Sequence, residues 1–308
     1  MASAGNVLIE NSIVSNCTLK AYKAHAGAIL TDGNLTVVNS VITHSQAVSP
    51  HFAAGGAGLI YGDLTLQYSM ISDNAATSTE VYSVVGTFHV IGNVLIQNST
   101  ISGNQADNLA TFLFRPYHNS PTALIINSTI SDNRAAVGAA GVYTATPLAI
   151  YNSTIAFNSS QIGGALAIFD VGTALENYTL YLDSTIIASN TIDGPGGHAA
   201  DLAASTNLTL TVIGANNLVG SADPNVTLPP DTLDADPMLL PLADNGGPTW
   251  TMALASGSPA IDTGANPLAL DTDQRGDGYA RVAGAAADIG AYEVQTPGDV
   301  IFVDGFDP

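Results

Sequence analysis

The sequence is poor in cysteine and in basic residues. Cys17 is the single cysteine among 308 residues, so no disulfide can form within the chain. Six Lys and Arg stand against 26 Asp and Glu, which gives a formal net charge of -20. Because a surface of this charge repels phosphate backbones and anionic lipids, we expect no nucleic-acid partner. Cations, neutral glycans and basic proteins stay open as partners.

The sequence also lacks a long uninterrupted apolar run. No stretch reaches the roughly 20 apolar residues of a membrane-spanning helix, so we expect no membrane insertion by this chain. The start, "MASAGNVLIENS", has no basic region followed by an apolar one, which is the pattern of a signal peptide. Because the first repeat begins near residue 7, we expect a signal peptide and an N-terminal cap, if the natural chain has them, to precede residue 1.

One short phrase recurs every 25 to 31 residues. Aligned on an anchor residue, the seven copies start at Asn11, Asn39, Tyr68, Asn98, Asn127, Asn152 and Asp183. A serine follows the anchor in every copy, and an aliphatic residue stands three positions after it. A period in this range with variable spacing is typical of a solenoid.

The residues around the anchor alternate as they do in a strand. The position two before it is large and mostly aliphatic, as in Ile9 and Val37, whereas the position just before it varies from Glu10 to Tyr151. β-branched residues and intervening Gly, Asn and Asp favour strands and turns over helices. A second strand is predicted between anchors, at residues 27–34, 56–63, 138–145 and 163–170. The pattern predicts an all-β parallel β-helix of about seven or more coils, with stacked ladders of serine and asparagine.

The alternation of "GGAL" strands with "NSTISxN" corners resembles right-handed parallel β-helix proteins. The resemblance is in particular to the polymorphic outer-membrane protein and adhesin repeats and to the pectate-lyase-like superfamily. From about residue 234 to 293, "DADPMLLPLADNGGPTWTMALASGSPAIDTGAN", "DTDQRGDG" and "DIGAYE" resemble the segment that closes the helix in bacterial surface proteins called choice-of-anchor Q proteins.

The resemblance implies a right-handed helix of coils over residues 1–233, a closing segment over 234–293, and a linker with a short tail over 294–308. It also implies an extracellular or bacterial cell-surface location. The tail "DVIFVDGFDP" resembles C-terminal tails of secreted proteins from some gammaproteobacteria, which would indicate sorting or surface attachment. Alternatively, Val300 to Val303 form one edge strand against the last coil.

The scarce basic residues are concentrated between residues 20 and 134. Arg115, Tyr117 and His118 are the candidate catalytic residues, because Tyr and His transfer protons and Arg can hold a carboxylate. The candidates for substrate binding are Lys20, Tyr22, Lys23, His25 and His89. The alternative interpretation is that all of these are solvated loop residues.

Asp271, Asp273 and Asp277, the last followed by a glycine, have a spacing similar to that of calcium-binding loops. The segment lacks the bidentate Glu of an EF-hand, so that motif is excluded. Two hypotheses stay open: a structural calcium, or a carboxylate cluster that pairs with Arg275 and Arg281. We expect no required cofactor, and calcium is the metal that stays open.

Three functions are compatible with the sequence. The first is a secreted or surface-displayed β-helix that binds extended extracellular polysaccharide along its outer face. The second is a polysaccharide lyase or glycoside hydrolase on the same rod, in which two or three carboxylates would perform acid and base catalysis. The third is a structural module that self-associates through its ends. Fold and resemblance alone do not decide among them.

Overall fold

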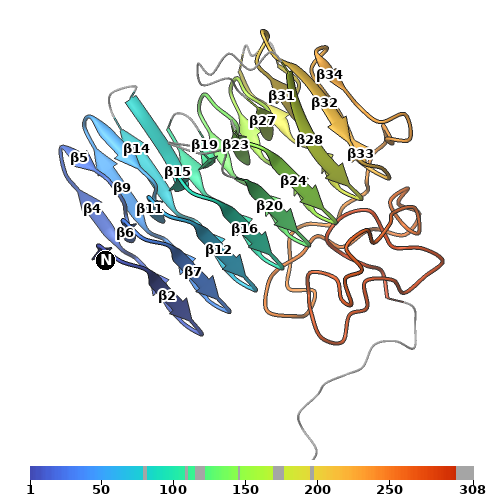
Figure 1. The fold of residues 1–308 in the computed structure, drawn as a ribbon, viewed down its shortest axis with the longest axis horizontal. Coiled ribbons are helices and arrows are strands. Elements are labelled where there is room, and N and C mark those ends of the chain that lie inside the picture. The colour runs from blue at the N-terminus through green and yellow to red at the C-terminus, as the bar shows by residue number, and fades with distance from the viewer. Residues whose placement is uncertain are drawn as a thin grey trace, which may run out of the picture.

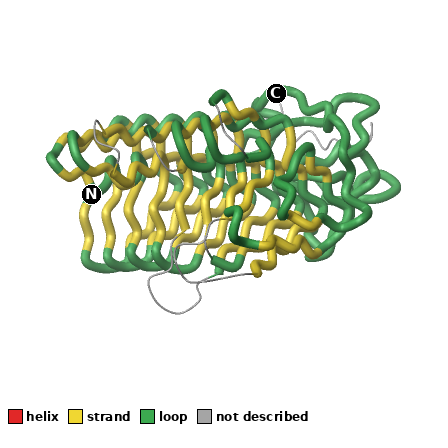
Figure 2. The backbone as a smooth tube through the Cα atoms, turned by 90° about the horizontal axis from the view of Figure 1, so that it is seen from above, coloured by secondary structure: helices red, strands yellow, loops and turns green. Residues whose placement is uncertain are grey.

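The computed structural model describes residues 1–78, 82–107, 110–114, 122–144, 146–168, 177–194 and 198–295. In these ranges every regular element is a β-strand, and the named strands pair in parallel. Figure 2 shows the strands as successive ribs along the long axis of a rod. The chain is therefore an all-β parallel β-solenoid, as the sequence predicts. The described residues include no helix long and apolar enough to cross a membrane.

The described strands form four sheets, here called A to D, and successive turns add one strand to each (Figure 1). Sheet A contains β1 (Ala2–Ser3), β5 (Lys23–Ala24), β6 (Ile29–Thr31), β10 (Phe52–Ala54), β11 (Gly58–Ile60), β15 (Tyr82–Val90), β19 (Ala110–Phe114), β23 (Val142–Thr144), β27 (Leu166–Ile168) and β31 (Leu202–Ala204). Sheet B contains β2 (Val7–Glu10), β7 (Leu35–Val38), β12 (Leu64–Gln67), β16 (Val94–Gln97), β20 (Ala123–Ile126), β24 (Leu148–Tyr151), β28 (Asn177–Asp183), β32 (Thr209–Ile213) and β34 (Val226–Thr227).

Sheets C and D follow sheet B in each turn. Sheet C contains β3 (Ile13–Ser15), β8 (Val41–Thr43), β13 (Met70–Ser72), β17 (Thr100–Ser102), β21 (Thr129–Ser131), β25 (Thr154–Ala156), β29 (Ile186–Ala188) and β33 (Leu218–Val219). Sheet D contains β4 (Thr18–Lys20), β9 (Gln46–Ser49), β14 (Ala75–Ser78), β18 (Gln105–Ala106), β22 (Arg134–Ala135), β26 (Ser159–Ser160) and β30 (Thr191–Ile192). The number of coils is approximate because the sheets hold different numbers of strands.

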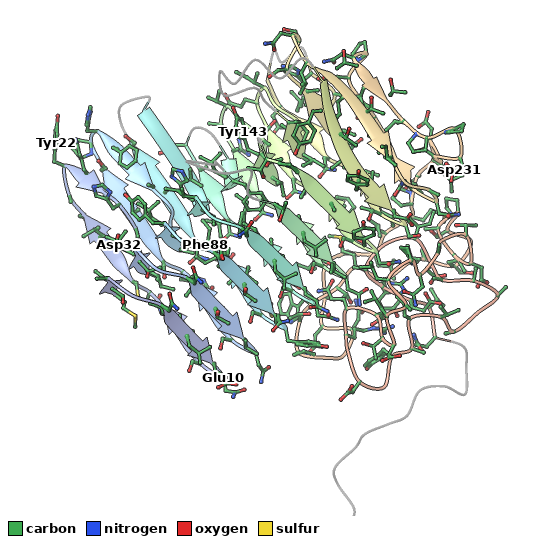
Figure 3. All side chains as sticks on the ribbon, in the orientation of Figure 1. Glu10, Tyr22, Asp32, Phe88, Tyr143 and Asp231 are labelled. Atoms are coloured by element: carbon green, nitrogen blue, oxygen red, sulfur yellow. The ribbon has the colours of Figure 1, made fainter. Side chains whose placement is uncertain are left out.

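The core is the line of inward side chains that the alternation predicts. In the first six copies the position two before the anchor is buried, for example at Val37 and Leu66. The position three after it is half-buried in the first copy and buried in the others, for example at Ile42 and Ile71. Aromatic side chains fill the centre of the rod beside sheet A, where Phe88 and Phe112 meet edge to face at 5.6 Å (Figure 3). Each turn is therefore stabilised by contact with the turns above and below it.

The repeated serine and asparagine positions form two ladders. In the first, the backbone N–H of each corner serine donates to the hydroxyl of the next turn, as Ser69 does to Ser99 and Ser99 to Ser128 (both 3.2 Å). In the second, buried side-chain amides donate from turn to turn, from Asn74 through Asn104, Asn133 and Asn158 to Asn190. The predicted ladders are confirmed, and they satisfy polar groups that the corners would otherwise bury without partners.

The anchor is a corner residue with a left-handed backbone, which asparagine tolerates better than most residues. Its φ angle is 49° at Asn98 and 50° at Asn127. In the seventh copy the prediction is wrong by one residue, because Tyr151 pairs with Asp183 and the left-handed residue is Ser184. This turn is one residue longer than the sequence alignment assumed, which shifts its whole register.

The closing segment, residues 234–293, lies beside the solenoid rather than only across its end. It has isolated bridges and no named strand. Figure 1 shows it, in orange and red, next to the ends of β16, β20 and β24. Three corner amides donate to its carbonyls: Asn98 to Asp273 (3.1 Å), Asn127 to Thr272 (2.8 Å) and Asn152 to Ala265 (2.8 Å).

The closing segment covers the three copies that read Asn-Ser-Thr, and it also contacts the seventh copy, where the Ala265 N–H donates to Ser184 Oγ (2.7 Å). The threonine hydroxyls of the three Asn-Ser-Thr copies also bond to the closing segment. Thr100 donates to the Trp250 carbonyl (2.5 Å) and Thr129 donates to Gln274 Oε1 (2.6 Å). Thr154 accepts from the Ala291 N–H (3.1 Å). In the first three copies the threonine position holds Ile13, Val41 and Met70, which are exposed or half-buried. The phrase thus forms a corner in every turn, and from the Asn98 copy onward it also forms a docking row for the closing segment.

Candidate functional site

The three candidate catalytic residues, Arg115, Tyr117 and His118, lie outside the described residues. They belong to the connection between β19 in sheet A and β20 in sheet B. Their role stays a prediction.

Four of the candidate binding residues lie together in the first turn, between sheets D and A. Lys20 ends β4, Lys23 begins β5, and Tyr22 between them is 66% exposed (Figure 3). The Tyr22 ring stacks on His51 of the next turn, with 5.1 Å between centroids. His25 meets another aromatic ring of that turn, Phe52, at 5.7 Å. The structure therefore assembles a small basic and aromatic group on an otherwise acidic protein.

His89, the fifth candidate, lies elsewhere. It is on β15 in sheet A, where its register partners are Leu59 on one side and Leu113 on the other. Both leucines are buried. His89 therefore lies between two buried leucines of sheet A, and Leu59 belongs to the apolar cluster against which Phe52 packs.

The three candidate calcium ligands do not gather around one point. Asp273 is fully buried, whereas Asp271 and Asp277 are exposed. The carboxylate of Asp273 pairs with Arg275, with 2.6 Å between Nη2 and Oδ2. Over the described ranges no group of three or more His, Cys, Asp or Glu side chains is placed to hold a metal ion. These contacts support the alternative hypothesis, in which the carboxylates pair with arginine.

Two buried arginines stabilise the closing segment. Arg275 is sandwiched between the rings of Tyr279 and Tyr292, with 3.9 Å from its guanidinium carbon to each ring centroid. Arg281 is 1% exposed and pairs with Glu293, with 3.1 Å between Nη2 and Oε2. Burial raises the pKa of Glu293 to about 7, although two backbone N–H groups and Arg281 favour its charged form.

The free face of the solenoid belongs to sheet B. Its outward row, called here the open row, runs through Leu8, Thr36, Thr65, Leu95, Leu124, Ala149 and Tyr181, one residue per turn. Every member is exposed or half-buried, and Tyr181 is 48% exposed. No member carries a charge. Seven strands at the spacing of a sheet make a surface roughly 30 Å long.

A row of mixed polar and apolar residues runs beside the open row. Gln67 and Gln97 are half-buried, lie on adjacent strands and hydrogen bond to each other at 3.3 Å. The same row also holds Tyr151 and the apolar Val38 and Ile126. Its two ends carry the charged side chains of Glu10 and Asp183. The face thus combines flat apolar and aromatic surface with amide and hydroxyl groups, a combination suited to an uncharged, hydroxyl-rich chain.

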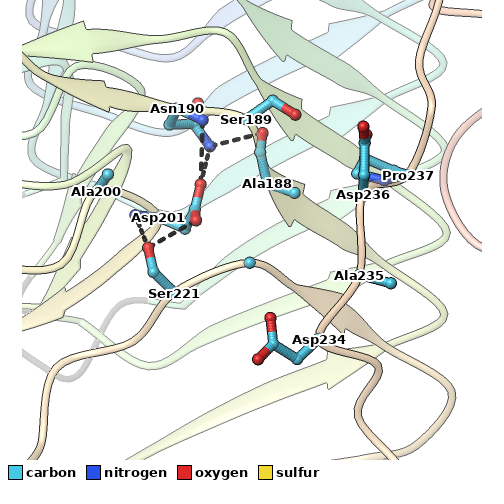
Figure 4. A pocket seen from close by; sticks show the side chains of 11 residues that line it. Ala188, Ser189, Asn190, Ala200, Asp201, Ser221, Asp234, Ala235, Asp236 and Pro237 are labelled. Atoms are coloured by element: carbon cyan, nitrogen blue, oxygen red, sulfur yellow. Dashed lines mark hydrogen bonds between the residues drawn. The ribbon is translucent and has the colours of Figure 1, made fainter.

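A cavity of about 520 Å³ lies where the last turns meet the closing segment (Figure 4). Asp201 on its wall is 4% exposed and accepts from the side-chain amide of Asn190 (2.8 Å) and from the hydroxyl of Ser221 (2.7 Å). Burial raises the pKa of this carboxyl above its ordinary value. Asp234 and Asp236 on the opposite wall are exposed. The asparagine ladder therefore ends on a carboxyl at the edge of a cavity.

Sequence reasoning missed this arrangement because Asp201 follows a turn, like several other aspartates near the second strand. It also left out His198, whose Nδ1 lies 2.6 Å from Oδ2 of the buried Asp223. The Ser221 hydroxyl donates to Asp201, and His198 contacts Asp223.

No protein-family model matches the sequence, and no curated protein matches it.

Proposed function

We propose that this protein binds an extended, neutral polysaccharide along the open row of sheet B. The observation that carries the proposal is the flat, uncharged, solvent-accessible row that repeats at one residue per turn. Sheet C is covered by the closing segment in the middle and last turns, so sheet B offers the longer uninterrupted surface.

The charge of the chain supports the neutral class of glycan. The open row has no Lys or Arg to pair with a uronate carboxylate, and the net charge of -20 repels polyanions. A linear ligand suits a surface whose groups repeat at the spacing of strands. The resemblance to adhesin and choice-of-anchor Q repeats adds a secreted or bacterial cell-surface location to the proposal.

Replacing Tyr181 by alanine is expected to weaken polysaccharide binding about tenfold, because an exposed aromatic anchor contributes roughly 1 to 2 kcal/mol. The measurement is affinity electrophoresis of the whole chain in gels that contain neutral or uronic-acid polysaccharides. Tyr61→Ala is the matched control, since Tyr61 is exposed to a similar extent (47%) but lies outside the strands of sheet B. Equal loss in both variants, or retardation by no neutral polysaccharide, would refute the proposal.

Glycoside hydrolysis is the second candidate function, and the cavity at Asp201 favours it. A carboxyl with a raised pKa opposite exposed carboxylates provides an acid and a base, which this chemistry needs. Arg115, Tyr117 and His118 stay candidates for a lyase instead. Release of new reducing ends or of unsaturated products from the same polysaccharides would support an enzyme, and their absence with retained retardation would leave binding alone.

A further inference from the structure

The docking row of sheet C continues beyond the closing segment as an apolar strip. Ile13, Val41 and Met70 are register partners on β3, β8 and β13, and the next partner in the row is Thr100. Ile13 is 73% exposed, and the other two are half-buried. From Thr100 onward the equivalent side chains are buried under the closing segment. The strip is therefore the uncovered continuation of an interface that the chain forms with itself.

Trp250 marks the border between the covered and uncovered parts. Its carbonyl accepts from Thr100 Oγ1 (2.5 Å) and from Gln274 Nε2 (3.0 Å), which fixes it beside the turn that follows Met70. Trp250, the single tryptophan of the chain, is 46% exposed. Large apolar side chains that remain accessible next to a buried interface indicate a docking surface.

We propose that residues 296–308 of this same chain dock on the apolar strip. Their sequence, "TPGDVIFVDGFDP", contains four consecutive apolar residues and a further phenylalanine. The residues flanking the strip on sheet C, Ser15, Thr43 and Ser72, are uncharged. The covered half of the row shows the kind of ligand that this surface takes, which is an irregular stretch of the chain's own C-terminal part.

The described chain ends within reach of the strip, although Val294 packs against the apolar cluster of the last turns. The carbonyl of Glu293 accepts a hydrogen bond from Arg275 Nη2 (2.6 Å). Gly276, the residue after Arg275, lies against the ring of Tyr68. Tyr68 stands two residues before Met70. Since the strip covers three strands, it measures roughly 10 Å, whereas a segment of this length reaches about 40 Å when extended. Residues 296–308 can therefore span the strip without any change in the closing segment.

The test uses Trp250 fluorescence in the full chain carrying Ile301→Asp and Phe302→Asp. Both substitutions lie outside the described residues that form the solenoid, so the fold is expected to survive, and circular dichroism checks it. We expect acrylamide quenching of Trp250 to rise about twofold, because apolar cover is removed from the border of the strip. Asp304→Asn is the matched control, since it alters the same segment without removing an apolar side chain.

Val41→Glu, which alters the strip itself, is expected to raise the quenching to the same extent and to add nothing in combination with the tail substitutions. Unchanged quenching in the variant with Ile301→Asp and Phe302→Asp overturns the proposal. An increase in that variant that Val41→Glu fails to reproduce also overturns it, because residues 296–308 would then cover Trp250 from a position against the last coil. An increase found only where sedimentation shows a dimer also overturns it, because the segment would then bind a second copy.

Discussion

Replacing Arg281 by methionine is expected to destabilise the closing segment by about 3 to 5 kcal/mol at about pH 8, because it leaves the buried carboxylate of Glu293 without its charged partner. Arg281 is fully enclosed and also donates to the carbonyls of Gly290 (2.9 Å) and Asp288 (2.7 Å), which lose these bonds. The measurement is thermal unfolding by circular dichroism, with limited proteolysis to show which part opens first.

The loss in Arg281→Met should be smaller at about pH 5 than at about pH 8. The pKa of Glu293 is already raised by burial, to about 7, and removing the guanidinium raises it further. A carboxyl whose folded pKa exceeds its unfolded value contributes stability that is present in acid and is lost as the pH rises through the folded pKa. Arg134→Met is the control, because Arg134 pairs with Asp193 at 3.8 Å on the surface. Equal losses in the two variants, or a larger loss in acid, would contradict this account.

Replacing Asn133 by leucine is expected to destabilise the solenoid by about 4 kcal/mol or more, since several buried polar groups lose their partners at once. The Asn133 amide donates to the Ile101 carbonyl (3.0 Å) and to Asn158 Oδ1 (2.9 Å). Its Oδ1 accepts from both the backbone and the side chain of Asn104 (3.1 and 2.9 Å). Leucine has a similar volume, so the change tests the ladder rather than the packing.

The midpoint of urea unfolding is the measurement for Asn133→Leu, and Ser45→Ala is its control. Ser45 occupies the same column in an earlier turn and is equally buried, but its hydroxyl makes one bond, to the Thr43 carbonyl (3.3 Å). We expect this control to lose about 1 kcal/mol. A leucine variant as stable as the control would show that the ladder contributes little beyond filling space.

The repeat made the fold predictable because its information is local and redundant. The buried columns, the corner and the serine ladder follow from the phrase itself, and Ile42, Asn98 and Ser99 lie where it places them. The last copy was misplaced because an extra residue before Ser184 is invisible when one serine is aligned with another.

The docking row and the cavity could not be read from the repeat. The contact of Asn127 with Thr272 joins residues 145 positions apart, and the closing segment has no period from which its path could follow. The difference between Thr100 and Met70 at equivalent corners was visible in the sequence, but its meaning depends on what covers each turn. The carboxyl of Asp201 becomes distinctive only through burial and its place at the end of the ladder.

The central claim is that the Asn-Ser-Thr corners hold the closing segment and leave sheet B free. Hydrogen exchange in Asn127→Ala and Asn39→Ala tests it most directly, because both anchors have a left-handed backbone, at φ angles of 50° and 47°, and only Asn127 contacts the closing segment. We predict that exchange in residues 263–293 becomes about tenfold faster in Asn127→Ala alone, the effect of losing roughly 1.4 kcal/mol. Equal exchange in the two variants would contradict the claim.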